Sequence, residues 1–225
     1  MRKNTISGLL IGMSVLSVSS LAQADLTANV GVTSNYVFRG ESYSDNGFAI
    51  QGGLDFTHTK SGLYAGIWGS NVEDSGPQHD KGFEVDYYGG WNFKANENVT
   101  FDVGIIAYRY YDTDTFTDSD EIFVGAALYG FSATYYDGSP DTGPDYGYVD
   151  LKYTLALKDD FNVHVHFGNN NSDNSYYDWN DISLGISKEI VGIDMSLTWS
   201  SIDYNDSTRD DDNNLFITLT KSFDL

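Results

Sequence analysis

The chain has 225 residues with 33 acidic and 12 basic side chains, a formal net charge of −21. Charge of this sign repels nucleic acid, and the absence of a basic patch, a Walker loop or a dinucleotide fingerprint leaves nucleotide and nucleic-acid functions without support. The chain has no cysteine, which excludes a disulfide framework and CxxC motifs. Its 17 Tyr, 13 Phe and 4 Trp argue against the disorder that charge alone would suggest.

The N-terminus carries the features of a secretory signal. Arg2 and Lys3 precede an apolar run over 6–21, which ends in a small-x-small cleavage site. We predict a cleaved signal peptide over 1–24, because the run is interrupted and shorter than the ~20 apolar residues that a retained helical anchor needs. The remainder, 25–225, is predicted to form one domain, and its 10 basic against 33 acidic residues give a net charge of −23.

From residue 26 onward, apolar residues alternate with polar or small ones in twelve segments, as in β-strands with two different faces. Most are close to the ~9 to 11 residues that a tilted strand needs to cross a bilayer. The sequence therefore predicts an all-β fold, a 12-stranded antiparallel transmembrane β-barrel. The expected strands are 26–38, 48–57, 62–71, 83–93, 98–109, 120–129, 131–137, 146–157, 161–169, 179–188, 192–202 and 213–223.

The connections separate a membrane barrel from a soluble sandwich. Short links such as 58–61 and Gly130 alternate with long ones such as 39–47 and 203–212. Bacterial barrels have short periplasmic turns and longer outer loops, whereas a sandwich gives no reason for strict alternation. Three apolar residues, Val37, Ile106 and Phe123, fall on the polar face and break the pattern.

Aromatic residues on the apolar face occur at both ends of the expected strands, as in the interfacial girdles of membrane barrels. The alternative is that they fill a sandwich core. At the short-turn ends they are Phe56, Trp91, Phe93, Phe131, Phe161 and Phe223, and at the long-loop ends Tyr36, Phe38, Phe48, Phe83, Phe167 and Trp199.

Three segments, 34–40, 51–55 and 62–72, resemble the TorF family of Gram-negative outer-membrane porins. The resemblance implies a barrel in the bacterial outer membrane and a channel, without catalytic residues or a substrate to carry over. The last strand also resembles the amphipathic, aromatic-ended signal of outer-membrane assembly, which makes the barrel-assembly machinery an expected partner. Here Phe223 is followed by Asp224 and Leu225, a departure from a terminal aromatic.

If the apolar face meets lipid, the other face lines the lumen and its charges become candidate selectivity elements. We therefore predict an outer-membrane channel for passive diffusion of small solutes that prefers cations. The alternative is that the acids pair locally and fill the interior. The inward acids are Asp55, Glu84, Asp86, Asp102, Glu121, Asp150, Asp181 and Asp194, Lys152 is the inward base, and Arg39 is expected near the outer rim.

Tyr64, Trp68, Tyr88, Tyr108 and Tyr148 also point inward by parity. They could narrow the passage, stack on a sugar-like solute, or simply pack.

His164 and His166 share one strand face and have the spacing of two metal ligands, but without a third ligand a polar lumen role is favoured. No nucleophile motif accompanies the four histidines, so an enzyme is not expected.

The expected outer loops are rich in carboxylates, including Asp210, Asp211 and Asp212. Oxygen ligands at this density can bind Ca²⁺ or Mg²⁺, ions that also bridge lipopolysaccharide phosphates, although the spacing is not that of an EF-hand and acidic runs are commonly just solvated. No other cofactor is expected. These loops define the alternative function, a non-conducting structural or adhesive barrel whose loops bind divalent cations.

Overall fold

The computed structural model describes residues 24–74, 76 and 79–225. Its strands are β1 (Asp25–Thr33), β2 (Val37–Phe38), β3 (Glu41–Ser42), β4 (Ala49–His58), β5 (Leu63–Glu73), β6 (Lys81–Lys94), β7 (Val99–Tyr111), β8 (Ser119–Leu128), β9 (Phe131–Pro140), β10 (Tyr146–Ala156), β11 (Phe161–Ser172), β12 (Trp179–Ile190), β13 (Ile193–Tyr204) and β14 (Asp212–Asp224). Two 3₁₀ turns, η1 (Lys158–Asp160) and η2 (Ser175–Tyr177), lie in connections.

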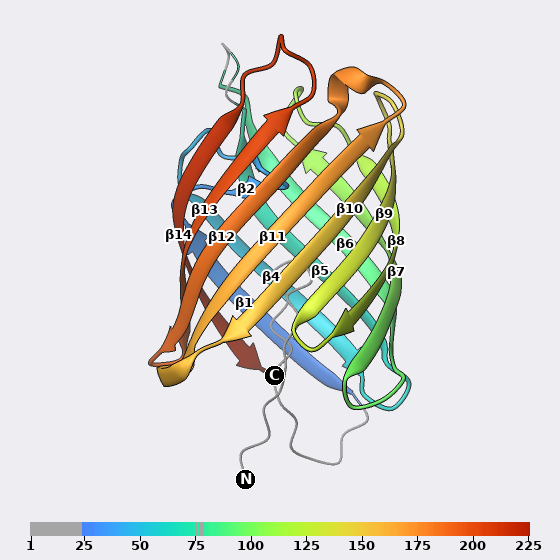
Figure 1. Ribbon diagram of the computed structural model, residues 1–225, viewed down its shortest axis with the longest axis vertical. Helices are drawn as coiled ribbons and strands as arrows, with labels where there is room; N and C mark the ends of the chain where they lie inside the picture. Colours follow the sequence, from blue (N-terminus) through green and yellow to red (C-terminus); the bar gives the residue numbers. More distant parts are fainter. Residues whose placement is uncertain (1–23, 75, 77–78) are drawn as a thin grey trace.

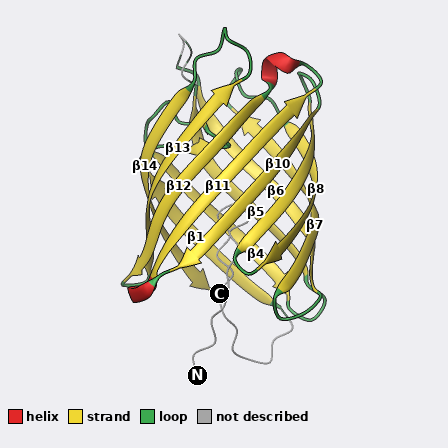
Figure 2. Ribbon diagram, in the orientation of Figure 1, coloured by secondary structure: helices red, strands yellow, loops and turns green. Residues whose placement is uncertain are grey.

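Twelve strands form one closed antiparallel barrel, in which each pairs with its sequence neighbour (Figure 1). The wall closes where β1 pairs with both β4 and β14. Closure leaves no strand edge unpaired, which the hydrocarbon core of a membrane requires of a β-structure. The predicted fold is therefore confirmed, and Figure 2 shows how little helix accompanies it.

The two faces of the wall differ as the alternation predicted. Outward apolar residues such as Ile105 and Leu215 are 61% and 69% exposed, whereas inward Glu84 and Asp181 are buried. A closed sheet that exposes its apolar residues and buries its carboxylates is suited to lipid outside and polar contents inside. Ten of the expected girdle aromatics, for example Trp91 and Phe167, are exposed on this outer surface.

The short turns lie at the end that carries the C-terminus (Figure 1). Tyr129 and Gly130 have φ of 50° and 83°, and Val191 and Gly192 have φ of 54° and 70°. Two positive φ angles in a two-residue loop are the requirement of the type I′ hairpin turn, which matches the twist of its strands. These turns fix the register of the strand pairs that they connect, β8–β9 and β12–β13.

The first strand departs from its predicted extent. β1 ends at Thr33 rather than residue 38, and residues 34–48 turn into the barrel, carrying the β2–β3 hairpin. Tyr36 and Phe38, expected on the outer girdle, lie inside instead: Tyr36 is buried, and Phe38 packs against buried lumen residues. The alternation of inward and outward residues in β1 continues over 34–38, and the sequence therefore predicts one long strand.

The predicted signal peptide, 1–24, lies outside the described residues except for Ala24. Within the described part of the chain, no helix has the length and hydropathy required to cross a membrane.

The barrel lumen as candidate functional site

The segment 34–48, called here the lumen loop, leaves the wall at a polar junction. The Asn35 side chain donates to Asn214 Oδ1 on β14 at 2.8 Å, and its own Oδ1 accepts from Ser42 at 2.7 Å and Ser44 at 3.1 Å. Because these bonds satisfy a buried amide, they hold the chain in its inward turn.

From this junction the loop crosses the lumen. The ring of Tyr36 lies 5.5 Å from that of Trp68 on β5, and the ring of Phe38 lies 5.9 Å from that of Tyr108 on β7. At the hairpin tip, a Cβ on Gly40 would come within 2.8 Å of Cβ atoms on β12 and β13. The loop therefore contacts opposite walls of the barrel and narrows its outer half.

Arg39 anchors the hairpin tip to the wall. Its guanidinium donates to both oxygens of Glu121 at 2.6 and 3.0 Å, and both side chains are almost fully buried. Its Cζ also lies 4.1 Å from the ring centroid of Tyr148 and 4.7 Å from that of Tyr136. A bidentate pair flanked by aromatic faces is a geometry that suits arginine.

Arg39 was expected near the outer rim. The structure places it in the outer half of the lumen, against Glu121 near the long-loop end of β8, and its charge is committed to that carboxylate. That carboxylate also accepts from the hydroxyls of Tyr108 at 2.9 Å and Tyr146 at 2.7 Å.

A second polar network lies on β10–β12 and joins five predicted residues. His166 bridges two acids, with Nδ1 3.2 Å from Asp181 Oδ1 and Nε2 3.4 Å from Asp150 Oδ1. Lys152 Nζ lies 2.5 Å from Asp150 Oδ2, and the Tyr148 hydroxyl donates to Asp181 Oδ2 at 2.9 Å. His166 therefore links two carboxylates in this network, whereas His164 has other partners.

The predicted residues on β4–β7 form tyrosine–carboxylate pairs. The Tyr64 hydroxyl donates to Asp102 at 3.0 Å, and the Tyr88 hydroxyl donates to Asp55. In both contacts a neutral hydroxyl donates to the carboxylate, and no salt bridge joins either acid to a basic side chain among the described residues. Asp194, also predicted to line the lumen, is exposed near the short-turn end of β13 and joins none of these pairs.

The lumen has two unlike walls. One, on β7–β10, carries a buried cluster of Ile106, Tyr108, Phe123, Tyr136 and Tyr148. The other, on β13, β14 and β1, presents half-buried small polar side chains. They are Thr27, Asn29, Ser196, Thr198, Thr218 and Thr220.

His164 lies apart from the His166 network. Its Nε2 is 2.8 Å from Ser187 Oγ, and its Nδ1 is 3.1 Å from Thr154 Oγ1. A serine–histidine pair is two parts of a nucleophilic site, but here the third group is a hydroxyl rather than a carboxylate, and the neighbouring strand amides are used in ladder pairing. The pair lacks the orienting acid that hydrolytic triads use.

At the long-loop end, Asp45 of the lumen loop, Glu73 at the end of β5 and His79 come together, a group that the sequence did not single out. Ligand atoms of Asp45, Glu73 and His79 all lie within 4.8 Å of one another, although Lys81 Nζ also lies 3.0 Å from Glu73. The predicted metal residues behave differently. Asp211 and Asp212 accept bonds from separate groups, the amide of Tyr204 at 3.0 Å and that of Asn213 at 2.7 Å, and Asp210 is exposed.

Two other loop carboxylates are fixed by local hydrogen bonds. The Thr113 hydroxyl, at 2.6 Å, and nearby backbone amides hold the pKa of Asp80 below its usual value. The side chain and amide of Thr208 do the same for the pKa of Asp206. Bonds to the ionised form favour it.

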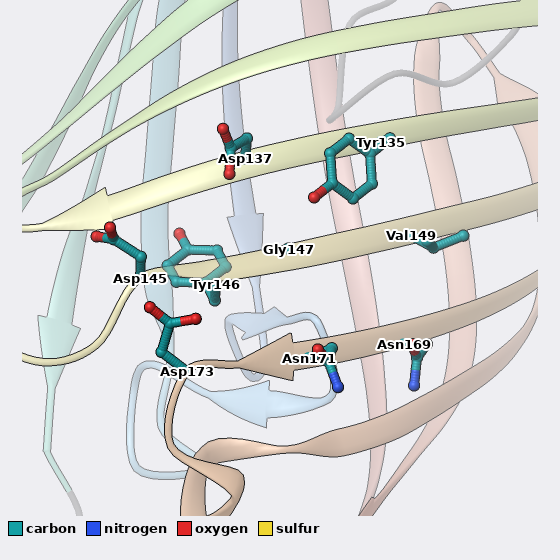
Figure 3. A pocket seen from close by; sticks show the side chains of 9 residues that line it. All are labelled: Tyr135, Asp137, Asp145, Tyr146, Gly147, Val149, Asn169, Asn171 and Asp173. Carbon is teal, nitrogen blue, oxygen red and sulfur yellow. The ribbon is translucent and has the colours of Figure 1, made fainter.

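The outer surface of the barrel also has a shallow groove of about 290 Å³ where β9, β10 and β11 reach the long-loop end (Figure 3). Gly147 forms its floor, since a Cβ there would lie 2.6 Å from the Tyr135 hydroxyl. The groove is outside the lumen, at the rim. Its polar lining is Tyr135, Asp137, Asp145, Tyr146, Asn169, Asn171 and Asp173.

The closed barrel, its apolar outer band and its polar contents define a bacterial outer-membrane β-barrel protein. Residues 19–223 match the model of a family described as a bacterial protein of unknown function (Gcw_chp), and the chain belongs to that family. The TorF resemblance stays a prediction. A search of curated proteins finds no match.

Solved structures support the same fold. The NanC porin is 12% identical with a TM-score of 0.59, and the match covers 89% of this chain and 100% of that one. A protein from a study of in-meso crystallization of membrane proteins is 11% identical with a TM-score of 0.56, and the match covers 89% and 84% of the two chains.

Proposed function

We propose that the protein is an outer-membrane channel for passive diffusion of small solutes that prefers cations. The observation that carries the proposal is the charge of the lumen. Arg39 is neutralised by Glu121 and Lys152 by Asp150, whereas acids such as Asp55 and Asp102 have only hydroxyl or amide partners. A passage lined by uncompensated carboxylates attracts cations and repels anions.

The proposed route runs between the two walls described above, past the lumen loop. Small hydroxyl and amide side chains on β13, β14 and β1 can hydrate a solute, while Tyr64 on β5 and Tyr88 on β6 add aromatic faces to the lumen. A lumen with polar and aromatic side chains favours small, hydrated or sugar-like solutes. We assign no enzymatic role, because the Ser187–His164 pair lacks an orienting carboxylate.

Several partners form part of the proposal. The resemblance of 34–40 to TorF porins and the amphipathic last strand favour a porin assembled by the barrel-assembly machinery. The outer groove and the acidic loops, including Asp210, Asp211 and Asp212, are suited to Ca²⁺ or Mg²⁺ that bridges lipopolysaccharide phosphates. The outer band would contact outer-membrane lipid.

A second function is favoured by one specific observation. The lumen loop reaches both sides of the barrel, so a non-conducting structural or adhesive barrel with cation-binding outer loops is the competing proposal.

Planar-bilayer recording of the purified, folded protein separates the two. In a KCl gradient we expect discrete conductance steps and a reversal potential closer to the Nernst potential of K⁺ than to that of Cl⁻. A variant with Asp210, Asp211 and Asp212 changed to Asn controls for charge in the outer loops. Anion preference would refute the cation proposal, and absent conductance in correctly folded protein would favour the structural one.

A further inference from the structure

Two neighbouring acids on β6 face the lumen beneath the lumen loop. Glu84 is fully buried and Asp86 is 6% exposed. Residues two apart on a strand share a face and lie roughly 7 Å apart along the backbone. The two carboxylates are therefore close enough to repel each other in a site with little water.

Neither carboxylate is satisfied. The Tyr110 hydroxyl donates to Glu84 Oε1 at 2.8 Å, and the Tyr36 hydroxyl also interacts with this carboxylate. Glu84 Oε2 and Asp86 Oδ1 nevertheless lack a hydrogen-bond partner among the described residues. Buried polar atoms without partners are uncommon in folded proteins, and a bound ion is one arrangement that satisfies them.

No basic side chain of the described chain compensates these charges. The charges that act on Asp86 are those of the carboxylates of Glu84 and Glu121. Glu121 is already paired with Arg39, whose guanidinium uses both of its Nη nitrogens in that contact. Burying an unpaired carboxylate is strongly unfavourable, so a counter-ion would stabilise two adjacent ones.

The surroundings supply oxygen ligands and a cover. Ser70, directly opposite Glu84 on β5, is buried, and its hydroxyl donates to the Asn71 carbonyl at 3.0 Å, which leaves the oxygen lone pairs available. Tyr36 and Tyr43 of the lumen loop pack in the aromatic cluster above, together with Tyr110.

We propose that Glu84, Asp86 and Ser70 bind a hard divalent cation of the Ca²⁺ or Mg²⁺ class inside the barrel. Two carboxylates match its charge, and oxygen donors match its ligand preference. The bound ion removes the repulsion beneath the lumen loop and stabilises the loop in its inward position. This site is separate from the outer-loop carboxylates, and its occupancy does not require that the barrel conduct.

Calcium titration of the chelator-treated, detergent-folded full chain tests the site, with Mg²⁺ as a parallel titrant and calorimetric heat as the readout. We expect saturable binding heat from the lumen site, and we expect the double variant Glu84→Gln/Asp86→Asn to lose it. The matched control Asp55→Asn changes a lumen acid that has a tyrosine partner and should keep it. Asp45→Asn/His79→Ala should also keep it, which separates the lumen site from the outer cluster.

A second readout guards against loss of fold. Trp68 lies directly opposite Asp86, so Ca²⁺ should change the tryptophan fluorescence of the wild type and raise its melting temperature, but do neither in the double variant. Single variants Glu84→Gln and Asp86→Asn keep the site testable if the double variant fails to fold. Absence of saturable binding in the wild type, or equal binding in the folded double variant, overturns the proposal. Conductance without binding refutes this site alone, and binding without conductance refutes the channel alone.

Discussion

Arg39 should control whether the lumen loop stays docked. The perturbation is Arg39→Ala, which leaves Glu121 buried without its cationic partner and removes the contacts with Tyr136 and Tyr148. Breaking one side of a buried pair costs about 3 to 5 kcal/mol. At about 1.4 kcal/mol per tenfold change, even the lower value raises the undocked population of the loop about 100-fold.

The chain contains no cysteine, so a single introduced thiol reports on the loop without background. Val37→Cys places it in the half-buried hairpin. When docking is fast compared with the chemical step, the labelling rate tracks the open population. Maleimide labelling of Val37→Cys/Arg39→Ala should therefore be about 100-fold faster than that of Val37→Cys alone, by the same conversion. The conductance should rise in parallel.

Two further variants identify the cause. Glu121→Ala should act in the same direction, and the double variant should cost less than the sum of the two, since both remove one interaction. Arg209→Ala is the matched control, because Arg209 pairs with Glu41 at 2.9 Å in a partly exposed position where a salt bridge contributes about 1 kcal/mol or less. If Arg39→Ala labels no faster than Arg209→Ala in the same Val37→Cys background, the anchoring role of Arg39 is wrong.

Three other outcomes follow from the geometry. Gly40→Ala should also release the hairpin and raise conductance, because its φ of +88° and the 2.8 Å approach of wall atoms leave no room for a Cβ; unchanged single-channel currents would count against it. Asp55→Asn/Asp102→Asn should lower the K⁺ over Cl⁻ permeability ratio in reversal-potential measurements while the heat-modifiable gel mobility stays that of folded protein; an unaltered ratio would place selectivity elsewhere. Because its folded pKa is lowered, Asp206 stabilises its loop above its unfolded pKa of about 3.9, and this contribution is lost as pH falls through the folded value. Hydrogen exchange at the Thr208 amide should rise at that low pH in wild type, and already at neutral pH in Asp206→Ala, which removes the acceptor.

The wall of the barrel could be predicted from the sequence because its physical requirements are local. A lipid-facing residue such as Ile105 must be apolar, and the next residue along the strand must suit the lumen. Type I′ turns such as Tyr129-Gly130 keep successive strands in register with links of two residues. Parity therefore placed Asp55, Glu84 and Asp181 inside, as the structure has them.

The grouping of the lumen residues could not be predicted in the same way. Parity gives the direction of a side chain but not its height or its partner across the barrel. Arg39 meets Glu121, 82 positions later, and Asn35 meets Asn214, 179 positions later. Such pairs depend on the shear of the barrel and on the path of the lumen loop. The alternation of apolar and polar residues predicts neither of them.

One signal of the lumen loop was present in the sequence nonetheless. Ile106 and Phe123 broke the alternation because they are apolar and face inward. In a water-filled barrel such residues would be exposed at a cost of about 25 cal/mol per Å² of apolar surface. In the structure they belong to the buried cluster against which Phe38 packs. Inward apolar residues in an otherwise polar lumen thus indicate that a segment of the chain occupies it, and Val37, the third exception, marks which segment that is.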